Sequence, residues 1–313
     1  MSDRRMRAGL TALGTTVLAG VAVVFGAVFA ARGAGDGSGS VPAMATAEYG
    51  RRLLRETSVL IGPDHPDPAM RYTGTRMACA SCHLDVGTEP GTLTLLSAAA
   101  KYPRFSGRDG GERDLRDRIN GCMERSMNGR ALPRESVEMI AMETYITTLG
   151  AEYAAMGATR RTPREQPAFV EPDRAADPAA GRAVFEARCA LCHGSDGAGL
   201  AAADVAGGYV FPPLWGPDSF NNGAGMGRVL TAAAFIKARM PLGKADLTDD
   251  EAFDVAAYIN SHPRPEMPDL ERDYPDRTTK PVDSPYPPYA DPFPQEQHRF
   301  GPFGPIRDYY KNR

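Results

Sequence analysis

The sequence of 313 residues is poor in cysteine and histidine, with five of each. It has no excess of positive charge, because 39 acidic side chains outnumber 36 lysines and arginines and leave a net charge of −3. This balance argues against a nucleic-acid-binding protein. No segment alternates apolar and polar residues strongly enough to predict a β-sheet, so the expected fold class is all-α.

Glycine and proline are abundant, with 33 and 27 residues. Both residue types interrupt regular structure, which predicts long loops between the helices. A chain with so much loop needs something besides helices and strands to organise its cores.

The N-terminus carries a targeting pattern. Arg4, Arg5 and Arg7 precede an uncharged run from Leu10 to Ala31. As a helix this run would span roughly 33 Å, about the thickness of a bilayer core. Basic residues before an apolar run predict export, either with the run kept as a membrane anchor or with the run cleaved as a signal. Both alternatives place the remaining chain in the periplasm.

Four of the five cysteines lie in two copies of one motif, CASCH at 79–83 and CALCH at 189–193. In an exported protein this motif is typical of haem c, because two thiols bond to the two vinyl groups of one porphyrin and the histidine ligates the iron. The motif predicts two covalently bound haems c. Their attachment residues are Cys79, Cys82 and His83 for the first, and Cys189, Cys192 and His193 for the second.

Other uses of these cysteines fit less well. A disulfide or a thioredoxin-like redox pair gives no reason for a histidine directly after the second cysteine, twice. A zinc site needs four ligands, and few other histidines remain: His65, His262 and His298.

The chain divides into five parts. Residues 1–44 hold the N-terminal run and a Gly/Ser linker, residues 45–150 form a first domain, and residues 151–175 form a polar linker. Residues 176–263 form a second domain. We expect residues 264–313, rich in proline and aromatic residues, to be an extended tail that docks over the domains; the alternative is disorder.

The two domains are weak repeats of each other. Each opens with a helical stretch (46–61 and 177–193) and closes with an amphipathic helix that contains Tyr-Ile (132–150 and 247–263). Acidic or hydroxyl residues at the start of the closing helices suit the N-terminal cap. The pattern predicts two class I cytochrome c-like domains.

Each haem iron has a sixth coordination position besides those taken by the porphyrin and the histidine. In the second domain Met240 lies in "ARMPLG", 47 residues after His193, where small c-type cytochromes place a Met-Pro ligand. A thioether ligand raises the reduction potential and suits an electron carrier.

The first domain offers three sulfur atoms. Met127 corresponds to Met240 when the two closing helices are aligned, Cys122 lies five residues earlier, and Met123 is a third choice. A lone thiol in an oxidising compartment tends to be oxidised unless it is occupied, which favours Cys122 as a ligand. The other interpretation of Cys122 is a buried, inert thiol.

From Tyr49 to Ile306 the sequence resembles the dihaem thiosulfate dehydrogenases, which join two thiosulfates into tetrathionate. The resemblance is carried by "FSGRDG" (105–110), "DRINGCMERSMNGR" (117–130), "PPLWGPDSFNNGAGMGR" (212–228), "FIKARMPLG" (235–243) and "YPDRTTKPVDSPYPPYADPFP" (274–294). The resemblance implies that Cys122 is the distal ligand of the first haem and is essential for catalysis. It also implies that Arg108, Arg118 and Ser126 line the substrate site.

Local charge agrees with this implication. Residues 101–130 hold eight basic and five acidic side chains, a positive surplus in a chain that is negative overall. Two dianions can meet only where cations offset their repulsion. A plausible mechanism joins the Cys122 thiolate to one thiosulfate, with two electrons leaving through the haems to an external acceptor such as a small cytochrome. A second thiosulfate then releases tetrathionate.

The sequence departs from the family at one position. Some relatives have a lysine just before the distal methionine that can ligate the second haem, whereas this chain has Arg239. A guanidinium stays protonated and cannot ligate, and Lys237 lies two residues away. We therefore expect His193/Met240 ligation in both redox states.

Three other functions remain open at this stage. The same site run in reverse is a tetrathionate reductase. A non-catalytic dihaem electron carrier would need only His/Met or His/His ligation, and Met127 as the first distal ligand would favour it. A cysteine S-thiosulfonate transferase would need a groove for a carrier protein.

Overall fold

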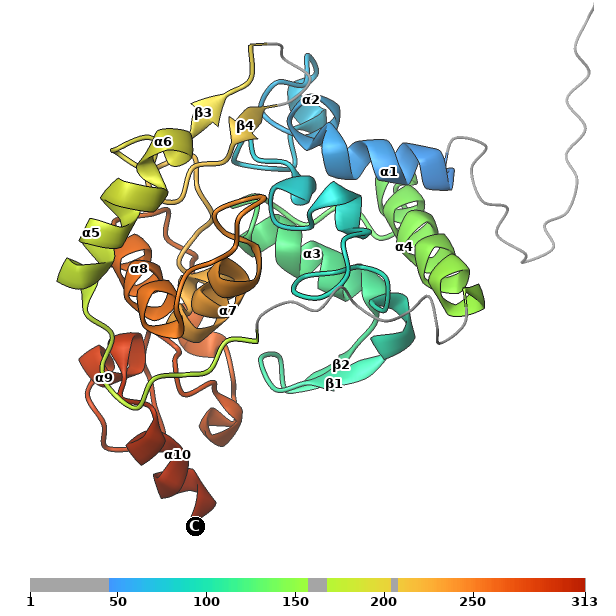
Figure 1. Ribbon diagram of the computed structural model, residues 1–313. Coiled ribbons are helices and arrows are strands. Elements are labelled where there is room, and N and C mark those ends of the chain that lie inside the picture. The colour runs from blue at the N-terminus through green and yellow to red at the C-terminus, as the bar shows by residue number, and fades with distance from the viewer. Residues whose placement is uncertain (1–44, 157–167, 204–207, 313) are drawn as a thin grey trace, which may run out of the picture. The chain divides into compact units, whose positions relative to one another are not determined.

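The computed structural model describes residues 45–156, 168–203 and 208–312. These residues are mostly helical, with long irregular connections (Figure 1). The apolar run Leu10–Ala31 and the Gly/Ser linker lie outside the described residues, as do residues 157–167 of the predicted linker 151–175. Within the described ranges, no helix has the length and apolar character needed to span a bilayer.

The first domain contains four α-helices, four short 3-10 helices and one hairpin. They are α1 (Ala47–Arg55), α2 (Thr57–Ile61), η1 (Pro68–Met70), η2 (Cys79–Ser81), η3 (Asp85–Gly87), η4 (Ala99–Lys101), β1 (Arg104–Ser106), β2 (Gly111–Arg113), α3 (Leu115–Arg125) and α4 (Val137–Ala155).

The second domain is built in the same way. Its elements are α5 (Pro178–Arg188), α6 (Ala190–His193), β3 (Leu200–Ala201), β4 (Tyr209–Phe211), η6 (Gly225–Gly227), α7 (Val229–Arg239) and α8 (Asp249–Ser261). In each domain the first and last long helices pack against each other, α1 on α4 and α5 on α8.

The closing helices α4 and α8 begin at hydroxyl N-caps inside the predicted stretches 132–150 and 247–263. The Ser136 side chain accepts from the backbone N–H of Met139 at the start of α4. Thr248 and Glu251 form a reciprocal capping box at the start of α8. These contacts satisfy N–H groups that have no partner inside the helix.

A glycine lets the helices cross closely in both domains. A Cβ at Gly50 on α1 would lie 2.0 Å from the Ala141 carbonyl oxygen of α4. A Cβ at Gly181 on α5 would lie 1.9 Å from the Asp254 carbonyl oxygen of α8. The equivalent glycines show that the sequence repeat is a structural repeat.

Each domain has its own hydrophobic core. The first core includes Leu53, Met123, Met139 and Met142, all of them at most 2% exposed. The second includes Phe185 and Phe253 and the single tryptophan, Trp215, whose ring centroid lies 4.9 Å from that of Phe185.

The expectation of no sheet is wrong in detail. Two antiparallel pairs are present among the described residues, β1 with β2 and β3 with β4. Each strand has only two or three residues, which is too short for an alternating pattern to appear in the sequence.

The C-terminal segment carries two 3-10 helices and two α-helices: η7 (Leu270–Arg272), η8 (Arg277–Thr279), α9 (Gln295–Phe300) and α10 (Gly304–Lys311). Phe303 and Ile306 are buried in the second core. Asp273 forms an ion pair with Arg125 of α3 in the first domain. The segment therefore contacts both domains.

Candidate functional site

The first C-x-x-C-H motif lies at an apolar cavity of about 370 Å³, which we call the haem cavity. Cys79 and Cys82 line it together with His83. Apolar side chains from α1, α3 and α4 complete its wall: Leu54, Ile119, Met142 and Ile146. None of the five cysteines, all of which are described, forms a disulfide. The donor set and the apolar walls fit a covalently bound haem c.

The imidazole of His83 is held in one orientation. Its Nδ1 lies 2.7 Å from the carbonyl oxygen of Leu93, so this nitrogen carries the proton and donates. The other nitrogen, Nε2, is thereby left as the basic atom, the form in which histidine ligates iron. His193 repeats the arrangement in the second domain, with its Nδ1 2.8 Å from the carbonyl oxygen of Pro212.

The thiols of the first domain differ in acidity. Burial raises the pKa of Cys79 to about 11 and that of Cys82 to about 12. Burial also raises the pKa of Cys122, but the Arg118 guanidinium and the His83 imidazole lower it more strongly, to about 6. The surroundings of Cys122 thus favour a thiolate near neutral pH.

Helix α3 places Cys122 beside Arg118. Asp114 and Asp117 form a reciprocal capping box that starts the helix. Arg118 and Cys122 are four residues apart and therefore share one face. An Nη1 N–H of Arg118 donates to the Cys122 sulfur at 2.9 Å, a contact that also holds the guanidinium at the cavity.

Met123 and Met127 line the same haem cavity as Cys122. Both methionines are buried in the first core, at 1% and 3% exposure. Cys122 differs from them because it also lines a second cavity. Of the three candidate sulfur atoms, Cys122 alone reaches both spaces.

The second cavity has a volume of about 460 Å³, and we call it the arginine cavity. Cys122 lies where the two cavities adjoin, because it belongs to the set of residues that line both: Cys82, His83, Leu93, Tyr102, Arg104, Arg118, Cys122, Ser126 and Met226. No acidic side chain occurs among the described residues that line it, whereas six arginines do: Arg104, Arg108, Arg113, Arg118, Arg125 and Arg228.

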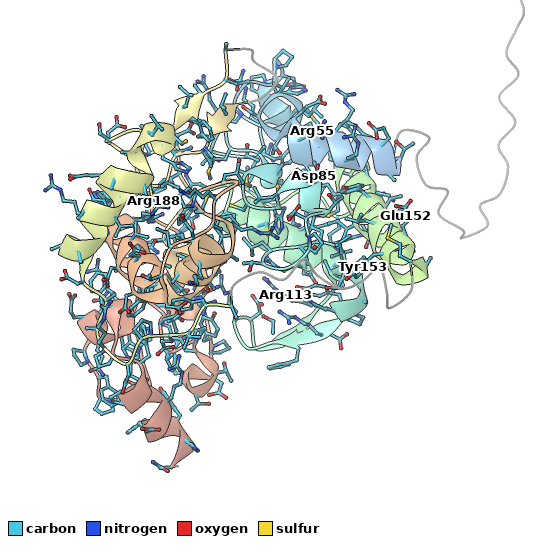
Figure 2. All side chains as sticks on the ribbon, viewed as in Figure 1. Arg55, Asp85, Arg113, Glu152, Tyr153 and Arg188 are labelled. Carbon is cyan, nitrogen blue, oxygen red and sulfur yellow. The ribbon has the colours of Figure 1, made fainter. Side chains whose placement is uncertain are left out.

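Carboxylates outside the cavity hold several of these arginines. Arg125 donates to both oxygens of Asp273, at 2.9 and 2.7 Å, and the pair is buried. Arg113, labelled beside the hairpin in Figure 2, pairs with Asp109 at 2.6 Å. Because the carboxylates lie behind the guanidinium groups, the cavity keeps a positive surface.

All four residues predicted for catalysis come together. Arg108 joins Arg118, Cys122 and Ser126 in the wall of the arginine cavity. Arg108 Nη1 donates to the Gly223 carbonyl at 3.1 Å, and its guanidinium lies over the Tyr274 ring, 5.6 Å from the centroid.

The sequence analysis missed several lining residues. Three arginines of the first domain belong to the cavity, and so do side chains from the second domain and the C-terminal segment: Arg104, Arg113, Arg125, Arg228, Thr231 and Tyr274. Arg228 is the last residue of segment 212–228, and Tyr274 is the first residue of segment 274–294. Both segments carry the family resemblance, and this resemblance was the signal that could have identified them.

The second haem site uses the second core. Cys189 and Met240 both pack against that core, and Met240 caps the C-terminal end of α7. Burial lowers the pKa of His193, which keeps this imidazole neutral as a ligand must be.

Arg239, which precedes Met240, points away from solvent and is only 7% exposed. Its Nη1 donates to Glu89 at 2.7 Å, and its Nη2 donates to the Pro90 carbonyl. Glu89 and Pro90 lie in the loop between His83 and Leu93. The guanidinium therefore ties the Met240 end of α7 to the loop that orients His83.

Comparison with known proteins agrees with this architecture. Residues 71–153 match the family model described as SoxA/TsdA, cytochrome c domain. Residues 176–259 match the model described as cytochrome C oxidase, cbb3-type, subunit III. Both halves of the chain are therefore cytochrome c domains, and two covalently bound haems c are expected.

Relatives similar to this chain are thiosulfate dehydrogenases. One from Allochromatium vinosum is 42% identical over 227 residues, which cover 69% of this chain and 77% of the relative. One from Stutzerimonas stutzeri is 40% identical over 223 residues, which cover 71% of this chain and 70% of the relative.

A solved structure gives the same result. The as-isolated form of a thiosulfate dehydrogenase (TsdBA) from Marichromatium purpuratum matches with a TM-score of 0.61 and 38% identity. The match covers 71% of this chain but only 47% of that longer chain. Given two haem c domains, a cysteine at the junction of two cavities and these relatives, the chain belongs to the dihaem thiosulfate dehydrogenase family.

Proposed function

We propose that this protein oxidises two thiosulfates to tetrathionate, with Cys122 as the covalent catalyst. One observation carries the proposal: the Cys122 sulfur lies where the apolar haem cavity meets the arginine cavity. A sulfur in this position has an electron acceptor on one side and room for anionic sulfur compounds on the other.

The two C-x-x-C-H motifs and the candidate sulfur atoms supply the residues that would hold the two haems. Cys79 and Cys82 would attach the first haem, and His83 and Cys122 would bind its iron. Cys189 and Cys192 would attach the second haem, and His193 and Met240 would bind its iron. When bound, the two haems supply the one-electron acceptors that thiosulfate oxidation requires.

The first step joins Cys122 to one thiosulfate. The thiolate and the sulfane sulfur of the dianion form an S–S bond with loss of two electrons, giving the monoanion Cys–S–S–SO₃⁻. Arg118 and Arg108 would offset the charge of the incoming dianion, and Ser126 would donate a hydrogen bond to it.

The second step needs no further electrons. The sulfane sulfur of a second thiosulfate attacks the sulfur that is bonded to Cys122. A new S–S bond forms as the Cys122–sulfur bond breaks, which releases tetrathionate and restores the thiolate. Cys122 is therefore both nucleophile and leaving group, two roles favoured by the Arg118 guanidinium, which donates to its sulfur at 2.9 Å and lowers its pKa.

Steady-state oxidation of thiosulfate with a one-electron acceptor tests the proposal, with tetrathionate measured directly. We expect one tetrathionate for every two thiosulfates and every two electrons. Oxidation to sulfate, or no oxidation, would contradict it.

We also propose a periplasmic location and an external redox protein, such as a small cytochrome, as acceptor. The proposal of export rests on Arg4, Arg5 and Arg7 before the run Leu10–Ala31 and on the two haem c motifs. Cell fractionation with N-terminal sequencing separates an anchored from a cleaved protein. For the Pro-rich segment 264–313 we propose a bracing role across both domains, supported by its contacts with Arg125 and the second core.

A further inference from the structure

One wall of the arginine cavity comes from the second cytochrome domain, and the first step proposed above does not use it. This wall consists of Gly225, Met226, Arg228 and Thr231. Met226 packs against both hydrophobic cores. The wall therefore has a fixed position relative to Cys122, as a subsite requires.

The guanidinium of Arg228 is oriented by the protein. Its Nη1 donates to Asp283 at 3.0 Å, and its Nη2 donates to the Thr231 hydroxyl at 2.7 Å. Asp283 is 2% exposed and also accepts from the backbone N–H of Leu230 at 3.1 Å. Each terminal nitrogen of a guanidinium has two N–H groups, so each keeps one for a ligand. The side chain is 27% exposed, which leaves it within reach of a ligand.

The cavity carries enough positive charge for the Cys122 adduct and a second thiosulfate together. Six guanidinium groups line it. Three carboxylates hold four of them: Asp109, Asp273 and Asp283. The surplus is three positive charges, which equals the sum of the adduct monoanion at Cys122 and a thiosulfate dianion. The same surplus balances the Cys122 thiolate and the first thiosulfate dianion, so the cavity keeps its charge balance in both steps.

We propose that the second cytochrome domain binds the second thiosulfate, through Arg228 and Thr231. The proposal rests on the proposed function, since it names the partner of the Cys122 adduct. Arg118 and Ser126 hold the first thiosulfate at Cys122, and Arg228 holds the sulfonate of the second while its sulfane sulfur attacks. The second domain then contributes to the substrate site in addition to accepting electrons.

Isotope exchange between labelled thiosulfate and unlabelled tetrathionate, on the holoenzyme without electron acceptor, tests this directly. Tetrathionate and the Cys122 thiolate give the adduct and one thiosulfate, and the reverse step incorporates label. Atoms and charge balance with no electrons transferred. The exchange thus depends on the second subsite and not on the acceptor.

We expect Arg228→Gln to raise the thiosulfate concentration for half-maximal exchange by about 10- to 100-fold, the loss of one charge-assisted contact. Mass spectrometry measures how much Cys122 adduct forms from thiosulfate and ferricyanide. We expect this amount in Arg228→Gln to stay close to that in the unchanged protein. Arg307→Gln is the matched control, because Arg307 pairs with Glu171 and does not line the cavity.

Two further variants guard against a folding defect. Arg228→Gln with Asp283→Asn removes the ion pair as a unit and leaves no buried carboxylate unpaired. Gly225→Leu fills the wall instead, since a Cβ at Gly225 meets no atom within 4 Å. We expect both to slow the exchange while both haems are retained.

The outcomes separate the two proposals. If the unchanged protein makes tetrathionate but Gly225→Leu and a folded Arg228 variant exchange label normally, the subsite is wrong and the proposed function stands. If the unchanged protein makes no tetrathionate, the proposed function itself fails. If the Arg228 variants lose both adduct formation and label exchange, the subsite is also wrong, because Arg228 would then act on the first thiosulfate.

Discussion

The two cytochrome domains share one helical arrangement but differ in what surrounds the distal sulfur. In both, a glycine lets the first helix cross the last, and a backbone carbonyl fixes the haem histidine. In the first domain the candidate sulfur is Cys122, in the last turn of α3 and open to a cavity lined by arginines. In the second it is Met240, at the end of α7.

The arginines beside these two sulfur atoms also differ. Arg118 contacts the Cys122 sulfur and lines the cavity. Arg239, next to Met240, is buried and engaged by Glu89 and Pro90. On the proposed function, one fold would serve catalysis or electron transfer according to whether the distal sulfur is an ionisable thiol that anions can reach.

Converting the first distal sulfur to the kind found in the second should have the largest effect. We expect Cys122→Met to keep both haems and the fold but to lower thiosulfate oxidation by at least about 10³-fold, because a thioether cannot form the covalent adduct. Cys122→Gly should lose activity equally. Haem content and a redox titration check that the variant is intact. Turnover by Cys122→Met at an appreciable fraction of the normal rate would show that the sulfur is only a ligand.

Removing the cation beside Cys122 should have the next largest effect. Arg118→Gln is expected to weaken thiosulfate binding by about 1.5–3 kcal/mol, the range for a charge-assisted hydrogen bond. Steady-state kinetics measure this as a higher KM. Arg116→Gln is the control, because Arg116 lies on the same helix but pairs with Glu135 and Glu143 outside the cavity. Equal effects of the two changes would mean that only helix stability is involved.

Changing the second distal ligand should leave the covalent chemistry intact. We expect Met240→Gly to abolish the sulfur-to-iron absorption band in the far red and to lower the potential of the second haem. Each fall of about 59 mV disfavours one-electron transfer to that haem about tenfold. Adduct formation at Cys122 should persist. If the band survives this change and is lost in Met127→Gly, the two methionines are assigned wrongly.

The contact between the two domains should give the smallest effect. Glu89→Gln removes the carboxylate partner of Arg239, and we expect about 1 kcal/mol of lost stability, since Glu89 is one-third exposed and its charge is partly screened. Thermal unfolding measures this loss. The spectrum of the Met240 site should shift slightly, because Arg239 anchors the adjoining residue. An unchanged melting temperature and spectrum would show that the ion pair does not couple the domains.

The local sequence determined the cofactors and the helices. A C-x-x-C-H motif needs only five consecutive residues to present two thiols and a histidine, so both haem sites were readable from the sequence. The capped closing helices were readable for the same reason, since Ser136 and Thr248 act on residues three positions away. Family resemblance added the proposed role of Cys122, because the spacing of residues left the distal ligand open among three sulfur atoms.

The tertiary structure alone decided which arginines form the site. The sequence shows a positive surplus near Cys122, but a guanidinium faces solvent or substrate according to the carboxylate that holds it. Asp273 reaches Arg125 across 148 residues, and Asp283 reaches Arg228 across 55. The hairpin that carries Arg104 and Arg113 could not be predicted from the sequence either. Its three-residue strands are fixed by their pairing with each other and are too short to show an alternating sequence pattern. Long-range ion pairs and strand pairs leave no periodic signal, so folding had to bring these groups together before the cavity could be recognised.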